Sequence, residues 1–344
     1  MKYSLPDALR HIARLKQSDP SQLVQRILEG ATPESLRSII GDALRPAFPD
    51  RQADAPPGRA DPERGRFVAN TYSNHAGTRP YKLYIPSGCR GQPVPLIVML
   101  HGCTQSPDDF AAGTRMNLAA EVHTCLVAYP AQTTAANMQR CWNWFNQADQ
   151  RRDDGEPSLI AGITHEIMRD HAVDPARIYV AGLSAGGAAA AIMGETYPEL
   201  YAAIGVHSGL ACGSARDMKS AFAAMQRGAD GQPRSARKRL TPSIVFHGER
   251  DATVHPRNGD AVIAQSVMAK PLRTRVETGH VPGGHGYSRT VHFEPDGTVV
   301  AEKWVVFGAG HAWFGGSPAG SFTDPRGPDA TGEMLRFFLA HKQD

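Results

Sequence analysis

One serine in this sequence stands in a turn suited to a nucleophile. Ser184 lies at the centre of Gly182-x-Ser184-x-Gly186. The apolar, partly β-branched residues 178–181 precede it and an alanine-rich stretch follows, which predicts a buried strand, a sharp turn and a helix. Such a turn exposes a serine hydroxyl above a parallel sheet, and the flanking glycines keep Cβ atoms out of the crowded junction. A purely structural glycine turn is the alternative.

A serine hydroxyl needs a base to activate it, and the base needs an acid to orient it. In enzymes with this turn the chain order is serine, acid, histidine. Asp251 follows a predicted strand, 243–247, and we prefer it as the acid to Glu249, which lies inside the turn; a surface-loop role for Asp251 is the alternative. His311 follows a later predicted strand and is the candidate base. The three residues predict acyl-transfer chemistry.

Other histidines are less suited to the role of base. His207 and His247 stand at the ends of predicted strands, where structural histidines are common. His280 and His285 lie in a glycine-rich segment and could indicate a metal site. Because no cysteine or aspartate lies near them in the sequence, we expect no metal there.

The negative charge that develops on an ester oxygen needs two hydrogen-bond donors. The amide of Ala185 would supply one from the first turn of the helix, where the dipole favours negative charge. The second is expected from the loop after the predicted strand 95–100, which reads His101-Gly102-Cys103. Gly102 would let the chain turn so that the Cys103 amide faces the site. An ordinary tight strand exit is the alternative.

The composition is that of a soluble globular enzyme. Of the 344 residues, 41% are apolar and 21% are charged, with a net charge of +3. The basic residues are mostly dispersed, so we expect no nucleic-acid partner. No apolar run approaches the roughly 18 residues of a membrane span. The N-terminus shows no readable signal peptide, which predicts a cytoplasmic protein. The five cysteines are too few for a disulfide scaffold, and the oligomeric state stays open.

The chain divides into three parts by pattern. Residues 1–45 show helical periodicity and predict a small N-terminal helical extension. Residues 46–66 are rich in proline, arginine and aspartate, as in a linker. Residues 67–344 alternate strands and helices, which predicts an α/β domain with a mostly parallel sheet flanked by helices. Residues 212–240 are long, polar and basic, and form a possible cap segment.

The elements that would position the site can be placed approximately. We expect an edge strand at 82–85 and a single helix from 107 to about 122. Further strands are expected at 95–100, 125–129, 178–181, 202–207, 243–247 and 299–307, and further helices at 157–171 and 331–341.

Four segments together resemble one family of enzymes. They are Leu100-His-Gly-Cys-Thr-Gln-Ser-Pro-Asp-Asp109, Arg140-Cys-Trp-Asn-Trp-Phe145, Gly182-Leu-Ser-Ala-Gly-Gly187 and Gly310-His-Ala-Trp-Phe-Gly-Gly-Ser-Pro-Ala-Gly-Ser-Phe-Thr-Asp-Pro325. This set is similar to the poly(3-hydroxybutyrate) depolymerase family of esterases, over roughly residues 67–338. The resemblance implies an α/β-hydrolase fold, a carboxylic-ester substrate, no cofactor, and Ser184, Asp251 and His311 as catalytic triad.

The resemblance implies a serine esterase that cleaves polyesters, oligoesters or short acyl esters through an acyl-enzyme. Other members of this broad family resemble acetylxylan or feruloyl esterases, and that is the alternative. A serine peptidase or thioesterase would share the same catalytic residues and is less favoured, as is a non-catalytic binding protein of the same fold. Many members of the family are secreted, so the resemblance implies an extracellular protein. The lack of a readable signal peptide instead predicts a cytoplasmic one.

Several aromatic residues beside the matched motifs are predicted substrate contacts. Trp142, Trp144 and Trp313 could hold an acyl chain or a ring, and His101 is a further candidate. For Trp142 and Trp144, core aromatics that fix the loops are the alternative, whereas Trp313 is favoured as a pocket wall because it follows His311 by two residues.

Two cysteines are expected to face each other across the site. Cys103 and Cys141 belong to loops that should both emerge at the C-terminal edge of the sheet. A disulfide there would clamp the oxyanion loop to a substrate-facing loop. Two buried thiols in a reducing cytosol are the alternative.

Overall fold

The computed structural model describes residues 65–229, 241–267 and 271–343. The predicted helical extension at 1–45 lies outside the described residues, as does nearly all of the predicted linker. Arg66 already begins the first strand, so the predicted linker boundary at residue 66 is slightly too late.

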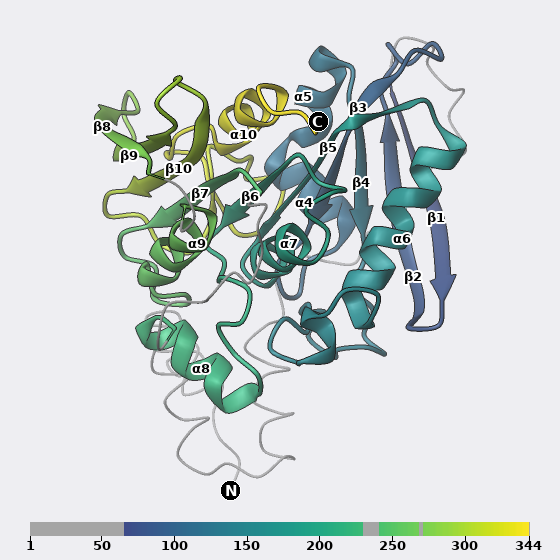
Figure 1. Ribbon diagram of the computed structural model, residues 1–344, viewed down its shortest axis with the longest axis horizontal. Coiled ribbons are helices and arrows are strands. Elements are labelled where there is room, and N and C mark those ends of the chain that lie inside the picture. Colours follow the sequence, from purple (N-terminus) through teal and green to yellow (C-terminus); the bar gives the residue numbers. More distant parts are fainter. Residues whose placement is uncertain (1–64, 230–240, 268–270, 344) are drawn as a thin grey trace, which may run out of the picture. The chain divides into compact units, whose positions relative to one another are not determined.

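A single ten-stranded sheet forms the centre of the described chain, in the order β1-β2-β4-β3-β5-β6-β7-β10-β9-β8 (Figure 1). The six strands from β4 to β10 in this order are parallel, and the outer strands at both ends are antiparallel. The strands are β1 (Arg66–Asn74), β2 (Gly77–Ile85), β3 (Val94–Leu100), β4 (Leu126–Pro130), β5 (Val173–Leu183), β6 (Ala203–His207), β7 (Ser243–Gly248), β8 (Arg273–His280), β9 (Gly286–Phe293) and β10 (Val299–Val306). Two short strands, β11 (Trp313–Phe314) and β12 (Thr323–Asp324), form a separate parallel pair.

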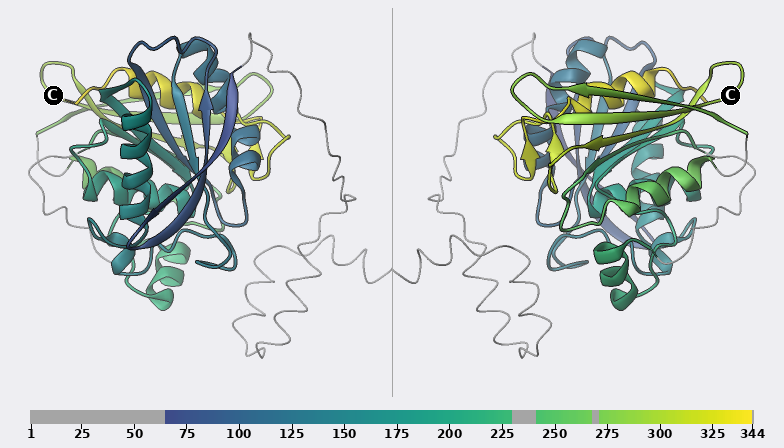
Figure 2. Two further views of the ribbon diagram at one scale, coloured as in Figure 1. Left: turned by 90° about the vertical axis from the view of Figure 1, so that its right-hand side faces the viewer. Right: turned by 90° about the vertical axis from the view of Figure 1, so that its left-hand side faces the viewer.

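Helices cover both faces of the sheet, as the edge-on views show (Figure 2). One face carries α6 (Gly155–Asp170), α7 (Ala185–Thr196) and α9 (Arg257–Val267). The other carries α4 (Pro107–Thr114), α5 (Met116–His123) and α10 (Ala330–Leu339). The remaining helices of the described residues are α8 (Met218–Arg227) and the 3₁₀ turn η1 (Ala148–Gln150).

The continuous apolar run of strand β3 follows from its position at the centre of the sheet. All seven residues are buried. Leu96 and Val98 pack into the core beneath α6 and α7, whereas Ile97 and Met99 pack into the core beneath α4, α5 and α10. Because side chains alternate between the two faces of a strand and both faces are covered here, every position is apolar.

The single helix expected over 107–122 is two helices. Ser106 caps α4 by accepting a hydrogen bond from the Asp109 amide, and Pro107 occupies the first turn, as the sequence predicts. Arg115 then takes a left-handed conformation with φ 56°, which ends α4 and redirects the chain into α5. Arginine gives no sequence signal for this conformation, which is usually found at glycine or asparagine.

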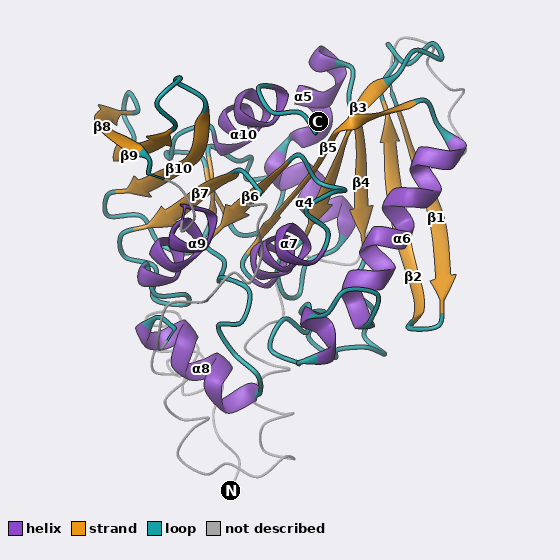
Figure 3. Ribbon diagram, in the orientation of Figure 1, coloured by secondary structure: helices purple, strands orange, loops and turns teal. Residues whose placement is uncertain are grey.

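Two further expectations about the sheet need correction. Residues 82–85 belong to β2, which pairs with β1 and β4, so this strand is not at the edge. The hairpin of β8 and β9 was not expected, because residues 273–280 are mostly polar and exposed. The described part of the expected cap segment 212–240 contains α8, an amphipathic helix (Figure 3).

The parallel strands end at a common edge of the sheet, and loops from this edge carry the candidate site residues. The loops after β3, β5, β7 and β10 contain Cys103, Ser184, Asp251 and His311. Among the described residues, no helix is long and apolar enough to cross a membrane.

Candidate active site

Ser184 occupies a strained turn between β5 and α7. Its φ of 57° and ψ of −118° lie outside the regions that non-glycine residues prefer. A Cβ on Gly182 would overlap the backbone of Gly186, and a Cβ on Gly186 would overlap the carbonyl oxygen of Leu100. Both glycines are therefore required for the close approach of β5, α7 and the loop after β3. Strain of this kind clusters at functional sites, where the surrounding fold maintains it.

Asp251 and His311 form a hydrogen-bonded pair. His311 Nδ1 lies 2.7 Å from Asp251 Oδ2. The other oxygen, Oδ1, accepts hydrogen bonds from the amides of Thr253 and Val254 at 2.9 and 2.8 Å. Since Nδ1 faces the carboxylate, Nε2 is the ring nitrogen left to take a proton from a serine. Within the described residues, no hydrogen bond joins Ser184 Oγ to His311, and such bonds are often long until substrate binds.

The carboxylate of Asp251 is held in its charged form. Its side chain is buried, which by itself would raise its pKa, but hydrogen bonds from His247 and His311 outweigh this effect and hold the pKa well below its usual range. The competing acid, Glu249, instead accepts a hydrogen bond from the Gly308 amide at 2.9 Å. The geometry therefore favours Asp251 as the partner of His311.

The loop after β3 lies against the serine turn. A Cβ on Gly102 would lie 3.7 Å from Ser184 Cβ. Gln105 Oε1 accepts a hydrogen bond from the Gly102 amide at 2.9 Å, which fixes the turn that leads into Cys103. The amide of Ala185 is at the first helical position, where it has no partner within the helix. Cys103 and Ala185 thus follow directly on two residues, Gly102 and Ser184, that lie in contact.

Gln105 was not singled out by sequence reasoning, although it lies in a matched motif. Its amide nitrogen donates to Asp109 Oδ2 at 2.8 Å and to the carbonyl of Ser321 at 3.1 Å. Asp109 in turn accepts from the Ser321 amide at 2.9 Å. This network joins the loop after β3 to the segment after His311. Gln105 and Asp109 lie 216 and 212 positions before Ser321 in the sequence, so only the fold reveals this connection.

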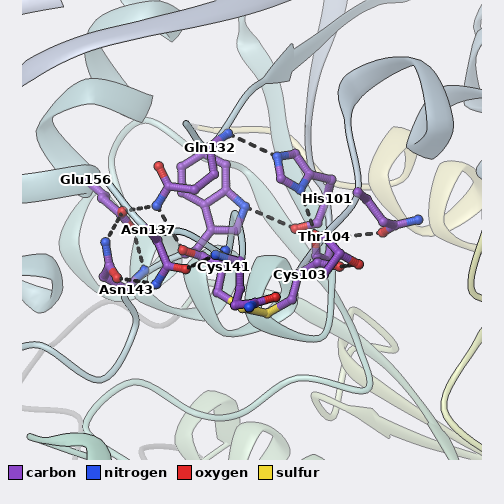
Figure 4. Close-up of a disulfide and its surroundings, with 12 residues drawn as sticks. His101, Cys103, Thr104, Gln132, Asn137, Cys141, Asn143 and Glu156 are labelled. Atoms are coloured by element: carbon purple, nitrogen blue, oxygen red, sulfur yellow. Dashed lines mark hydrogen bonds between the residues drawn. A yellow bond between two sulfur atoms is a disulfide. The ribbon is translucent and has the colours of Figure 1, made fainter. Parts of the chain in front are cut away.

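A disulfide links Cys103 to Cys141 (Figure 4). The two loops are also joined by a hydrogen bond of 2.7 Å from the Thr104 amide to the Gln139 carbonyl. The bridge therefore holds the loop after β3 against the loop after β4.

Glu156, at the start of α6, holds the loop after β4 in place through hydrogen bonds. Its carboxylate accepts hydrogen bonds of 2.8 Å from both the backbone and the side-chain amide of Asn143, and it also accepts one from Gln132 (Figure 4). Arg79 lies 3.4 Å away. Burial, with Asp149 nearby, raises the pKa of Glu156 to about 7. Sequence reasoning missed this residue because a glutamate in the first turn of a helix is usually exposed.

The structure does not support the predicted substrate contacts. His101 is buried, its Nδ1 pairs with the Gly102 carbonyl and its Nε2 accepts from the Gln132 amide. Trp142 is 0% exposed and donates to the His101 carbonyl, and Trp313 is 1% exposed and donates to Thr331. The prediction is therefore wrong for these three side chains, which fix the loops.

Trp144 is 7% exposed, and its ring packs edge-on against Phe145. Unlike Trp142 and Trp313, it retains some exposed surface, so its role as a substrate contact stays a prediction.

The glycine-rich segment around His280 and His285 has a structural role. His285 Nε2 lies 2.8 Å from Asp324 Oδ2, and its amide donates to the Arg326 carbonyl. This pair connects the β8–β9 turn to β12. Across residues 65–229, 241–267 and 271–343, no group of three or more His, Cys, Asp or Glu side chains could hold a metal ion.

Known proteins with similar sequences are esterases and depolymerases by name. Poly(3-hydroxyalkanoate) depolymerase C of Paucimonas lemoignei is 31% identical over 71% of this chain and 61% of its own length. Feruloyl esterase B of Thermothelomyces thermophilus is 26% identical over 67% of this chain and 82% of its own. The chain thus spans less than two thirds of the depolymerase.

An acetyl xylan esterase from Aspergillus awamori has the same fold. It matches with a TM-score of 0.60 and 18% identity, over 80% of this chain and 99% of the other. The likeness and the parallel sheet with helices on both faces identify the α/β-hydrolase fold. The model of the family described as esterase PHB depolymerase matches residues 79–274, more than half of the chain. This chain therefore belongs to the PHB depolymerase family of esterases.

Proposed function

We propose that this protein is a serine esterase that hydrolyses carboxylic esters through an acyl-enzyme. The observation that carries the proposal is the 2.7 Å pair of Asp251 and His311 at the same sheet edge as the strained turn of Ser184. A strained serine alone would also fit a structural turn. A buried, charged acid that orients a histidine is what a hydroxyl nucleophile requires.

In the proposed reaction Ser184 Oγ attacks the ester carbonyl while His311 Nε2 takes its proton. The amides of Cys103 and Ala185 stabilise the oxyanion of the tetrahedral intermediate. His311 then returns the proton to the leaving alcohol, and the acyl group remains on Ser184. Water, activated by the same histidine, hydrolyses the acyl-enzyme. Asp251 keeps Nδ1 of His311 protonated and stabilises the imidazolium in both steps.

For the substrate we propose hydroxyalkanoate oligoesters or polyesters, with short acyl esters as simple substrates. The support is the likeness to the depolymerase of Paucimonas lemoignei and the family match. A carbohydrate esterase is the second candidate, supported by the likeness to feruloyl esterase B and to an acetylxylan esterase of Emericella nidulans, 25% identical over 58% of this chain.

An activity panel separates these candidates. Purified protein is assayed with p-nitrophenyl esters, hydroxybutyrate oligomers, acetylated xylan, feruloylated xylan and peptides, beside the Ser184→Ala variant. We expect ester hydrolysis that the variant lacks, with the highest kcat/KM on hydroxybutyrate oligomers. A higher kcat/KM on either xylan would favour the carbohydrate esterase. Cleavage of peptides alone, or full activity in the variant, would contradict the proposal.

We also propose that the protein matures in an oxidising compartment, because a disulfide is stable there and is reduced in a cytosol. The support is the Cys103–Cys141 bridge. Protein prepared from an oxidising compartment and denatured should show three titratable thiols without reductant and five with it. Five thiols in both preparations would contradict the proposal.

A further inference from the structure

One buried histidine that the proposed mechanism does not use stands between its parts. His207 is the last residue of β6, and β6 lies between β5, which leads to the serine turn, and β7, which leads to the acid (Figure 1). The side chain is 0% exposed. A buried imidazole is costly unless its nitrogens have partners, so the partners of this ring indicate its role.

His207 is bonded to both halves of the site. Its carbonyl oxygen accepts a hydrogen bond from the Ser184 amide at 2.9 Å. Its ring nitrogen Nε2 accepts one from the Phe314 amide at 3.1 Å. Phe314 follows His311 by three residues, in the short strand β11. A single residue therefore joins the serine turn through its backbone and the histidine loop through its side chain.

The ring is also fixed by stacking. It lies 5.0 Å from the Trp313 ring at an interplanar angle of 24° and 5.6 Å from the Phe246 ring at 9°. Phe246 belongs to β7, which leads to Asp251, and Trp313 follows His311 by two residues. The stacked rings thus connect the strand of the acid to the loop of the base.

The contacts define the protonation state of the ring. Nε2 faces an amide donor, so it carries the lone pair, and the hydrogen is on Nδ1, which faces Ser208 Oγ at 3.4 Å. Burial lowers the pKa of His207 well below its usual range, and His247 and His311 act in the same direction. The neutral Nδ1–H tautomer is the form that can hold Phe314.

We propose that His207 is a positioning residue that sets the His311 loop relative to Ser184 by accepting the Phe314 amide. The inference rests on the proposed esterase function. It predicts that the acceptor atom matters for turnover, beyond what the bulk of an aromatic ring contributes to the core. Without the acceptor the loop shifts, and misplacement of a catalytic group by about 1 Å costs on the order of 100-fold in rate.

Three variants distinguish the contribution of the hydrogen-bond acceptor of His207 from that of its aromatic ring. His207→Phe keeps an aromatic ring and removes the acceptor, His207→Gln keeps an acceptor and removes the ring, and His207→Leu removes both. We expect kcat to fall on the order of 100-fold in His207→Phe and His207→Leu with little change in KM, and to recover in large part in His207→Gln. If kcat follows aromaticity instead, so that His207→Phe is the active variant, the proposal is wrong. Tm values of all three show whether kcat simply follows stability, which would also overturn it.

A measurement on the wild-type protein tests the proposal even if the variants fail to fold. Nitrogen-15 NMR of the histidine rings distinguishes the two neutral tautomers. We expect His207 to be the Nδ1–H form, and an Nε2–H or doubly protonated ring would overturn the proposal. The wild-type and Ser184→Ala assays keep this separate from the proposed function. If wild-type protein hydrolyses no ester, the proposed function is wrong. If wild-type protein hydrolyses esters but loss of the His207 acceptor leaves kcat unchanged, only the proposed role of His207 is wrong.

Discussion

Replacing Cys103 and Cys141 together by serine tests whether their disulfide holds the loop after β3 in the position that activity requires. The bridge closes a loop of 38 residues. In the chain-entropy model a loop of this length stabilises the folded state by about 4 kcal/mol relative to the open chain. For a domain of this size that corresponds to a fall in Tm on the order of 10 °C.

The activity effect of the same variant follows from what the bridge holds. Cys103 is the proposed second oxyanion donor, and full loss of such a donor costs about 100- to 1,000-fold in kcat. The hydrogen bond from Thr104 to Gln139 still joins the two loops after the bridge is removed. We therefore expect a smaller loss, on the order of tenfold in kcat, because the donor is loosened and not removed.

The assay is hydrolysis of a p-nitrophenyl ester, well below the Tm of the variant, with and without dithiothreitol. Reductant should bring wild-type protein down to the rate of the double variant and leave the variant unchanged. Cys89→Ser is the matched control, because Cys89 is outside the bridge. Unchanged kcat in the double variant, or equal inactivation of the variant by reductant, would refute the clamp.

Three further predictions concern single residues. Asp251→Asn should lower kcat on the order of 10⁴-fold through the wrong histidine tautomer, whereas Glu249→Gln should be mild; a larger effect at Glu249 in the same kinetic assay would reverse the choice of acid. Because the folded state raises the pKa of Glu156 to about 7, the contribution of this residue to the free energy of unfolding should fall as pH rises from about 4.5 to 7, by on the order of 3 kcal/mol in wild type relative to Glu156→Gln. Denaturant unfolding of Glu156→Gln should lack this slope, and an identical slope would contradict the buried proton. Gly186→Ala should fail to give active, folded protein by circular dichroism and ester assay, because its Cβ meets the Leu100 carbonyl; a normal variant would contradict the described turn.

The sequence predicts the parallel centre of the fold well, for a physical reason. Strands such as β3 are buried on both faces, so each shows a short apolar run that is hard to mistake. The outer hairpin of β8 and β9 escapes this reasoning because β8 is largely exposed and polar. The break between α4 and α5 escapes it because Arg115 adopts a left-handed conformation that its side chain does not signal.

For the candidate site too, local features can be predicted from the sequence, whereas contacts between distant segments cannot. The turn around Ser184 is local, so its glycines reveal it. The positions of Asp251 and His311 follow from strand ends and chain order. Trp142 and Trp313 were misread, since whether an indole faces solvent or donates to a carbonyl, as Trp142 does, depends on contacts between distant segments. The connections made by His207 are likewise non-local, with Phe314 lying 107 positions away.

The central claim is that Ser184 is the nucleophile of an acyl-enzyme mechanism, and covalent labelling tests it most directly. Wild-type protein is treated with a fluorophosphonate, and the adduct is mapped by mass spectrometry while ester hydrolysis is followed in parallel. We predict one adduct on Ser184, complete loss of hydrolysis on its formation, and no adduct in Ser184→Ala, whose fold and Tm stay close to wild type. An adduct on a different serine, or hydrolysis that persists in fully labelled protein, would contradict the claim.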